Sequence, residues 1–274
     1  MRERIKNKNI LVIGDTIFDK TVNIEATGIS LESPTLKGNY KNEQLDIGGA
    51  GNVVKFLKLF GCNVTFLSAM AKHDESLFLN SCDKLINVGI NSNTKTRFWV
   101  SKQEEKYKYL QINDCGNTII GNIDLTLLKK NYDLIYISDY RCGLISDDLI
   151  QKIENLPYKL FVSAQLSDKK EKFFKYTNYH TAIVNEDEYN CITNNKKSNY
   201  IITLGKNGCK TIKNNKEERY PGYPVITKNI IGAGDAFAAA YITTECCDYA
   251  NRWASYVVSA DNKNNISLDG FYAC

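Results

Sequence analysis

The 274-residue sequence lacks the features that would assign it to several large classes of protein. No apolar run approaches the roughly 18 residues of a membrane-spanning helix, so we expect no membrane partner. The net charge is only +4, from 35 basic and 31 acidic residues, and so does not indicate a nucleic-acid partner. The length and the 43% hydrophobic content are instead typical of a globular chain with a sizeable core.

Metal-binding and redox patterns are missing as well. The nine cysteines include no C-x-x-C pair, and the only histidines, His73 and His180, lie in no recognisable motif. This spacing does not indicate a zinc site or a histidine-based catalytic triad. The N-terminal MRERIKNKN does not resemble a signal peptide, so we expect reduced cysteines and a cytoplasmic location.

Short apolar runs alternate with helical patterns along most of the chain. Residues 9–13 are typical of a buried strand, whereas apolar residues at helical spacing over 52–60 predict a helix that Gly61 ends. This alternation predicts an α/β fold with a mainly parallel sheet. The other predicted strands are 63–69, 133–138, 159–163, 181–184 and 200–204, and the other predicted helices are 75–88, 146–155, 234–244 and 248–259.

Two segments break the alternation. Residues 16–47 have no helical period, and residues 94–112 alternate like an exposed β-ribbon. Neither segment has enough apolar residues for a core of its own. We therefore predict a small β-sheet that emerges from one domain spanning residues 1–274.

The strongest chemical motif is GAGD at residues 232–235, which directly precedes a predicted helix. Small residues leave the first N–H groups of the helix exposed, and these groups bind anions together with the helix dipole. A carboxylate beside such a site suits a general base, so Asp235 could take a proton from a hydroxyl that attacks a phosphoryl group. The alternative is a glycine turn in which Asp235 caps the helix.

A second glycine-rich run, GGAGN at residues 48–52, also precedes a predicted helix. Val54 stands where the dinucleotide-binding fingerprint needs glycine or alanine, and no Walker P-loop sequence occurs. The run suits a hinge or the close approach of a ligand. A tight loop and C-to-N helix junction is the alternative.

Acidic residues follow two of the predicted strands. Asp15 and Asp19 follow the first strand, at the end where α/β sheets bind ligands, and their carboxylates suit a polyhydroxylated ligand. The NEDE run at 185–188 suits Mg²⁺ held through water. A capping aspartate and a solvated acidic helix start are the respective alternatives.

In their order and spacing, these four motifs resemble the ribokinase-like (PfkB) carbohydrate kinases over nearly the whole chain. The sequence is most similar to the heptose-7-phosphate kinases of bacterial surface-polysaccharide synthesis. GISLESP at 28–34 and ISDYRCG at 137–143 resemble their R-I-S-P-E-A-P and L-S-D-Y-x-x-G stretches. The resemblance implies a three-layer ribokinase-like fold with a central, mainly parallel sheet, in which residues 16–47 and 94–112 form a small β-sheet lid.

The resemblance also implies roles for single residues. Asp235 matches the catalytic base, and Gly232, Ala233 and Gly234 match its anion hole. The implied substrate-binding positions are Asp15, Asp19, Gly48, Gly49, Asn52 and Asp139, with Arg97 and Lys37 as candidates for binding a sugar phosphate.

The implied cofactors are ATP and Mg²⁺. Asn185 and Glu188 match the family's N-x-x-E motif, which organises Mg²⁺ and phosphates, and Glu188 would bind the metal through water. Thr203 and Gly205 fall where a strand end lines the nucleotide site, and Asn251 lies near the adenine pocket.

The sequence also departs from the family pattern. Asn229 replaces the first acid of D-T-x-G-A-G-D, and Ser163-Ala164-Gln165 replaces the acid and lysine of the heptose kinases' I-D-P-K stretch. Gly28 stands where a basic residue precedes the I-S pair. These changes leave room for another substrate or for reduced activity.

The resemblance implies an ATP-dependent sugar kinase that phosphorylates C1 of a heptose 7-phosphate in lipopolysaccharide or capsule precursor synthesis. The expected partners are a small sugar or sugar phosphate and a second subunit, paired through the lid as a homodimer. The length fits one kinase domain, so we expect the nucleotidyltransferase that some heptose kinases carry to lie on another chain.

Other functions remain open. One is a PfkB-type kinase of another sugar or a nucleoside, and another is a non-catalytic sugar- or nucleotide-binding protein on the same fold. A dinucleotide-dependent oxidoreductase is disfavoured by Val54 and by the GAGD–helix unit near the C-terminus.

Overall fold

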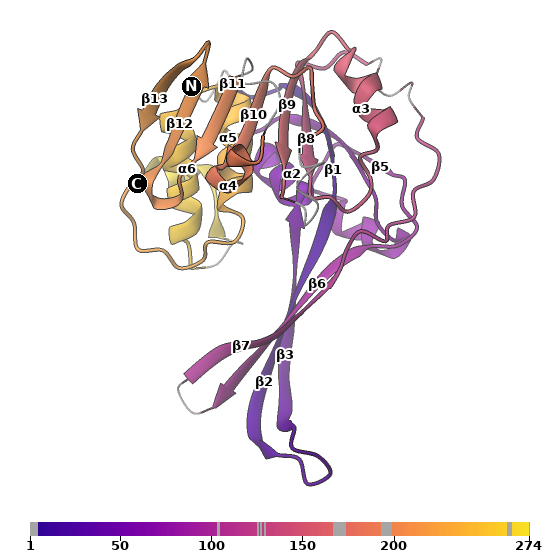
Figure 1. The fold of residues 1–274 in the computed structure, drawn as a ribbon, viewed down its shortest axis with the longest axis vertical. Helices are drawn as coiled ribbons and strands as arrows, with labels where there is room; N and C mark the ends of the chain where they lie inside the picture. Colours follow the sequence, from indigo (N-terminus) through magenta and orange to yellow (C-terminus); the bar gives the residue numbers. More distant parts are fainter. Residues whose placement is uncertain are drawn as a thin grey trace.

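A nine-stranded sheet forms the centre of the computed structural model, which describes residues 5–102, 105–124, 126, 128, 130–166, 174–192, 199–261 and 265–273. The strand order is β13-β12-β11-β10-β9-β8-β1-β4-β5, and all neighbours from β11 to β5 pair in parallel (Figure 1). This confirms the predicted α/β fold with a mainly parallel sheet. The strands are β1 Asn9–Gly14, β4 Asn63–Ser68, β5 Lys84–Asn87, β8 Leu134–Asp139, β9 Lys159–Ala164, β10 Thr181–Asn185, β11 Asn199–Thr203, β12 Cys209–Lys213 and β13 Lys216–Tyr220.

Strand periodicity divides the core between the two faces of this sheet. In β1, Ile10 and Val12 belong to one buried cluster, whereas Leu11 and Ile13 belong to another. Successive side chains of a strand point to opposite faces, so an all-apolar strand must be covered on both sides. The first cluster contains residues of α2 Ala50–Leu59, α5 Ala233–Thr244, α6 Cys247–Ser259 and α7 Leu268–Ala273, and the second contains residues of α3 Asp147–Glu154.

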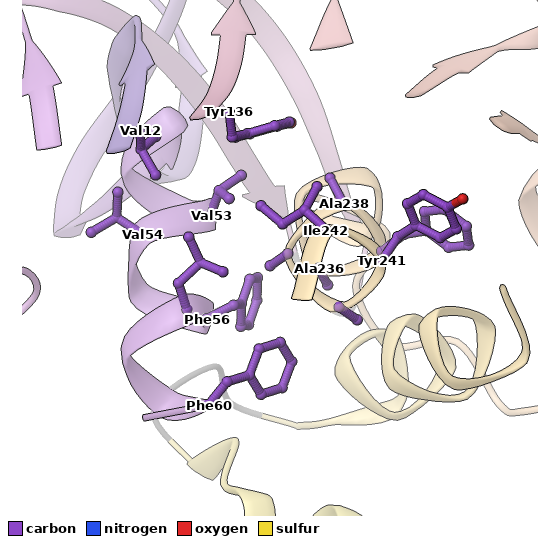
Figure 2. Packing of buried hydrophobic residues seen from close by; sticks show 14 of the residues in the cluster. Val12, Val53, Val54, Phe56, Phe60, Tyr136, Ala236, Ala238, Tyr241 and Ile242 are labelled. Atoms are coloured by element: carbon purple, nitrogen blue, oxygen red, sulfur yellow. The ribbon is translucent and has the colours of Figure 1, made fainter. Parts of the chain in front are cut away.

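The packing of α2 against α5 fixes the geometry of the site described below. Four alanines of α5, Ala236, Ala238, Ala239 and Ala240, are fully or almost fully buried, and such small side chains allow neighbouring helices to approach closely. Phe56 and Phe60 extend from α2 toward α5 and α6 (Figure 2), and the ring centroids of Phe60 and Trp253 lie 4.9 Å apart. The first turns of α2 and α5 are neighbours as well, because the Asn52 amide donates to the Asp235 carboxylate.

A four-stranded sheet projects away from the large one (Figure 1). Its order is β3-β2-β6-β7, with β2 and β6 parallel and the two outer pairs antiparallel. We call it the small sheet. Its strands are β2 Thr16–Ile29, β3 Leu36–Gly49, β6 Asn93–Lys102 and β7 Glu105–Asp114, within and around the two segments that break the strand–helix alternation.

One predicted helix is wrong. Residues 75–88 form the end of a 3-10 helix, η1 Lys72–Phe78, and then the edge strand β5. The Asp83 carboxylate accepts a hydrogen bond from the backbone of Val64 at 2.6 Å, and residues 84–87 then pair with β4. Pairing with the sheet thus overrides helical spacing that extends over only a few turns.

The sequence reading also missed β12 and β13, an antiparallel pair at one edge of the large sheet. Four of the five residues of β13 are exposed, so this strand shows no apolar alternation that would reveal it. Within the described residues, no helix is both long and apolar enough to cross a membrane.

Candidate active site

A cleft of about 130 Å³ lies at the carboxyl ends of β8, β9, β10 and β11, beside the first turn of α5. Parallel strands present their carboxyl ends at one edge of a sheet, where α/β folds bind ligands. Among the described residues that line the cleft there is no lysine or arginine. The described residues that line the cleft are Tyr136, Ser138, Asp139, Tyr140, Ser163, Ala164, Gln165, Ile183, Val184, Asn185, Glu188, Thr203, Gly234 and Asp235.

The GAGD run begins α5 as predicted. Gly232 is the N-cap residue, with a left-handed φ of 89° and no side-chain cap, and Ala233 and Gly234 open the first turn. A β-carbon on Gly232 would lie 2.4 Å from Nδ2 of Asn52, so this position also needs glycine for space. Helix N-termini with small residues suit anions.

Asp235 stands in that first turn and contacts two other elements. Its Oδ2 accepts a hydrogen bond from Nδ2 of Asn52 at 2.9 Å, and its Oδ1 accepts one from the hydroxyl of Tyr140 at 2.6 Å. Asn52 comes from the start of α2, and Tyr140 directly follows β8. The structure thus joins two predicted site residues, Asp235 and Asn52, that lie 183 positions apart.

The GGAGN run forms the tight junction between β3 and α2. Gly49 has a φ of 62°, and a β-carbon there would lie 2.4 Å from the carbonyl oxygen of Asp15. That same oxygen accepts a hydrogen bond from the backbone of Ala50 at 3.0 Å. Close backbone approach at Gly49 therefore places Asn52 next to the end of β1.

Asp15 is engaged by the protein and does not line the cleft. Its side chain is buried and accepts hydrogen bonds from the backbone N–H groups of Tyr140, Cys142 and Leu144 at 2.9, 3.2 and 3.4 Å. Burial and the nearby charge of Asp139 raise the pKa of Asp15 to about 6, against the opposing effect of these three bonds. In this arrangement Asp15 holds the loop that follows β8.

Asp139 lines the cleft, but its carboxylate is also well satisfied internally. It accepts hydrogen bonds from the hydroxyl of Tyr176 at 2.7 Å and from the backbone of Arg141 at 2.9 Å, and it forms an ion pair with Arg141 at 3.0 Å. These contacts favour a structural role for Asp139.

Asp19 and Arg97 form an ion pair on the small sheet, between neighbouring strands β2 and β6. Gly48 pairs in register with Ile17 of β2, and a β-carbon there would lie 2.9 Å from the Asp19 carboxylate. Lys37 pairs with Gly28 toward the far end of the β2–β3 hairpin. The two cationic candidates for binding a sugar phosphate therefore lie on different parts of the small sheet.

Asn185 and Glu188 form a capping box at the start of the short helix α4 Glu186–Asn190. The Asn185 side chain accepts from the Glu188 backbone at 2.8 Å, and the Glu188 carboxylate accepts from the Asn185 backbone at 2.9 Å. Burial raises the pKa of Glu188. Both residues line the cleft, as does Thr203.

Of the residues at this end of the cleft, Glu188 suits a bound Mg²⁺. Among the described residues there is no group of three or more potential metal-binding side chains. Mg²⁺ commonly takes one or two carboxylates and completes its shell with water and substrate phosphates. Glu188 fits that arrangement.

Two predicted nucleotide-binding residues do not line the cleft. Gly205 begins a 3-10 turn, η4 Gly205–Asn207, just beyond β11. Asn251 is buried in α6, where its amide donates to the carbonyl oxygens of Tyr220 and Pro221 at 3.2 and 3.1 Å. In this structure Asn251 fastens α6 to the end of β13.

The departures from the family pattern have structural roles here. The side chain of Asn229 accepts a hydrogen bond from the backbone of Ile231 at 2.9 Å and so shapes the approach to α5. Ser163 donates to the carbonyl oxygen of Ile183 at 2.8 Å. Both contacts stabilise backbone near the cleft without adding charge.

Tyr140 is the residue that the sequence reading missed. Its hydroxyl donates to Asp235, and it lies within ISDYRCG beside the predicted Asp139. Its position directly after a buried strand is the sequence feature that could have indicated a site residue. Nothing in the sequence alone indicates which of the polar residues in that loop turns toward α5.

Comparison with known proteins agrees with this architecture. Residues 182–269, which include α5 and α6, match the family model described as pfkB family carbohydrate kinase. The chain contains a PfkB carbohydrate kinase domain. The "Bifunctional protein HldE" of Aliarcobacter butzleri is 26% identical over 97% of this chain, and that of Campylobacter concisus is 31% identical over 83%. The matches span 64% and 48% of those two relatives.

Solved structures share the fold of the PfkB domain at low sequence identity. Ribokinase from Cryptococcus neoformans in complex with ADP is 13% identical, with a TM-score of 0.71 and coverage of 97% of this chain and 99% of that one. Phosphofructokinase-2 from Escherichia coli in complex with fructose-6-phosphate is 14% identical, with a TM-score of 0.70 and coverage of 98% and 97%. At this coverage the likeness in fold spans both sheets of the chain.

Proposed function

We propose that the chain is an ATP-dependent sugar kinase that transfers the γ-phosphoryl group to a sugar hydroxyl. The observation that carries this proposal is the carboxylate of Asp235, which lies at the first turn of α5 beside the cleft and is oriented by donors from α2 and the β8 loop. A carboxylate in that position suits removal of the hydroxyl proton.

The residues around Asp235 divide the remaining tasks. Backbone N–H groups of the GAGD turn stabilise negative charge that develops on the transferred phosphoryl group. Asn185, Glu188 and Thr203 line the part of the cleft where the nucleotide would bind, and Glu188 would hold Mg²⁺ through water. Bound Mg²⁺ supplies charge neutralisation at the phosphates.

Replacing Asp235 with asparagine tests this assignment. The variant keeps the side-chain shape but cannot accept the hydroxyl proton, so we expect kcat to fall by about 10²–10⁴-fold. ATP and sugar affinities, measured by calorimetry, should change little. Asp235→Asn with wild-type turnover would contradict the role.

Asp248 offers a matched control. It is also a first-turn aspartate, in α6, and accepts a hydrogen bond from the hydroxyl of Tyr223 at 2.6 Å. Asp248→Asn should leave kcat within about 2-fold of wild type, because this contact lies outside the cleft.

We further propose a heptose 7-phosphate, phosphorylated at C1, as the acceptor. The support is the resemblance of residues 28–34 and 137–143 to heptose-kinase stretches, together with the relatives named bifunctional protein HldE. A coupled ADP-release assay over a panel of sugars and nucleosides tests it. Preference for an unphosphorylated hexose, pentose or nucleoside would overturn this acceptor and leave the kinase proposal intact.

A non-catalytic binding protein is the second candidate. One observation favours it. The described lining of the cleft carries carboxylates but no lysine or arginine that would offset the negative charge of a nucleoside triphosphate. A binding protein would give heat of binding in calorimetry and no ADP release in the same panel.

The proposed partner of the small sheet is a second copy of the chain. Leu45 of β3 and Ile112 of β7 are each about half exposed, and they stand in one row across the sheet with Lys20 and Thr96. Because the four residues share a face, the sheet presents apolar side chains that a second small sheet could cover.

A further inference from the structure

The phenol of Tyr140 contacts Asp235 more closely than the amide of Asn52 does. Its hydroxyl donates to Oδ1 at 2.6 Å, whereas Nδ2 of Asn52 reaches Oδ2 at 2.9 Å. Hydrogen bonds to a charged acceptor are short and strong. The two donors approach different oxygens, so together they define the plane of the carboxylate.

Tyr140 is itself held in place by the backbone. Its N–H donates to the buried carboxylate of Asp15 at 2.9 Å, and the next two N–H groups along the loop that bind Asp15 belong to Cys142 and Leu144. On its other side the ring lies against the β3–α2 junction, where a β-carbon on Gly49 would be 3.5 Å from Cδ2 of Tyr140. The phenol therefore approaches Asp235 from a fixed direction.

The phenol also keeps its proton. Burial and the negative charge of Asp235 raise the pKa of Tyr140 well above its ordinary value of 10, and Tyr136 and Glu188 act in the same direction. A tyrosine that stays protonated donates to the carboxylate throughout the neutral range. It holds the acceptor without competing for the same proton.

We propose that Tyr140 is a positioning residue for phosphoryl transfer, which aligns the Asp235 carboxylate with the attacking sugar hydroxyl. The inference rests on the proposed kinase function. Each carboxylate oxygen accepts more than one hydrogen bond, so the contact with Tyr140 is compatible with proton acceptance by Asp235. Terminal carboxylate torsions are broad, so without the phenol the carboxylate would sample a wider range of orientations.

Tyr140→Phe is the first test, because it removes one oxygen atom and keeps the ring. We expect kcat for sugar phosphorylation to fall about 10- to 100-fold, the loss that corresponds to a hydrogen bond with a charged group. The KM values for ATP and sugar should stay within about 2-fold, because Tyr140 orients the base and does not hold either substrate.

Tyr176→Phe is the matched control. Tyr176 donates to a different buried carboxylate, Asp139, at 2.7 Å, so the substitution deletes the same kind of bond a short distance away. A comparable loss of stability in urea unfolding is expected for both variants. Only Tyr140→Phe should lower kcat, and an equal loss of kcat in Tyr176→Phe would overturn the specific role of Tyr140.

A double-mutant cycle separates this inference from the proposed function. Tyr140→Phe, Asp235→Ala and the double variant are compared by urea unfolding, which needs no activity, and alanine removes both oxygen atoms that could accept from the phenol. Additive losses of stability would overturn the contact and the inference with it, whatever the enzyme does. The losses of stability could instead be non-additive, which shows that the contact exists. If the wild type were then active and Tyr140→Phe kept full kcat, the positioning role alone would be overturned. A wild type that phosphorylates no sugar in the panel would overturn the proposed function and, with it, this role.

Discussion

Three carboxylates stand near the cleft, buried at Asp15 and Asp139 and half-buried at Asp235, and their partners differ. Among the described residues, Asp15 accepts hydrogen bonds from backbone N–H groups, whereas Asp139 accepts a phenol and pairs with Arg141. Asp235 accepts a phenol and an amide at the first turn of a helix. Asp235 alone joins the glycine-rich turn, α2 and the β8 loop. Its partners, more than its residue type, distinguish a candidate base from a structural acid.

The pKa of Asp15 has a measurable consequence for stability. The folded value is about 6, whereas the carboxyl group ionises near pH 3.8 in the unfolded chain. Between these values the folded state binds more protons than the unfolded state. The stabilisation from this group is therefore complete below about pH 4 and is lost as the pH rises through about 6.

Asp15→Asn tests that sign, because asparagine does not titrate. As the pH rises from 4 to 7, the free energy of unfolding of the variant should improve relative to wild type by up to roughly 3 kcal/mol, about two pKa units. Urea unfolding of both proteins across this range measures the change. A difference that is constant with pH would show that Asp15 does not titrate in this window.

The sequence indicated several of these residues but not their contacts. Asp235 and Asn52 stand in glycine-rich runs whose physical requirements are visible in the residue types, so their motifs could be recognised. Tyr140 could not be singled out, because its role depends on which way one loop side chain turns. Asn251 illustrates the opposite case, since its amide binds two carbonyl oxygens at the end of β13, a strand that the sequence did not reveal.

The start of α5 depends on two glycines. Gly232 provides a left-handed N-cap packed against Asn52, whereas a β-carbon on Gly234 would have no neighbour within 4 Å. Gly234 nevertheless lines the cleft. The two glycines thus serve different requirements, Gly232 for backbone geometry and Gly234 for access to the backbone N–H groups.

Alanine substitutions separate these requirements. Gly234→Ala should keep or slightly raise stability, by about 0.5–1 kcal/mol, because glycine is a poor helix residue. Its methyl group would enter the space proposed for phosphate, so kcat/KM for ATP should fall on the order of 10²-fold. Thermal unfolding and steady-state kinetics measure the two effects.

Gly232→Ala is the counterpart. It should lose about 1–2 kcal/mol of stability from the left-handed φ alone, with a further loss from the clash with Asn52. If Gly234→Ala were the more destabilised of the two, or kept full activity, this division would be contradicted.

Helices and strands were predictable to different degrees. Except for β5, the parallel strands follow apolar patterns that packing then satisfies, and so do the helices α2, α3, α5 and α6. Ser146 caps α3 as its hydroxyl suggests, at 3.2 Å from the backbone of Leu149. The edge strands β5, β12 and β13 escaped because an edge strand needs little apolar alternation. Their formation depends on the neighbour with which they pair.

In the molecule as a whole, the small sheet presents two unlike faces. One carries the ion pair of Asp19 with Arg97 and neighbouring polar side chains, and the other carries Leu45 and Ile112. Alternation along paired strands places these two sets of side chains on opposite faces, although the second face also carries Lys20 and Thr96. The apolar face is the one we propose to be covered in a dimer.

Leu45→Lys combined with Ile112→Lys tests the dimer. Charges on both strands should disfavour apposition of two small sheets, so sedimentation velocity should show a shift from the dimer toward the monomer mass. Leu79→Lys is the control, since Leu79 is 78% exposed and lies at the end of η1, outside the small sheet. An unchanged mass in the double variant would contradict the proposed interface.

The separation of the small sheet from the large one also gives the molecule two native optical reporters. Its only tryptophans are Trp99, in β6, and Trp253, fully buried among the rings of α2 and α7. Trp99 lies beneath the ammonium group of Lys106 on the neighbouring strand, 5.5 Å from its ring centre. Intrinsic fluorescence therefore contains one signal from the core and one from the projecting sheet, and quenching by a soluble ion would distinguish them.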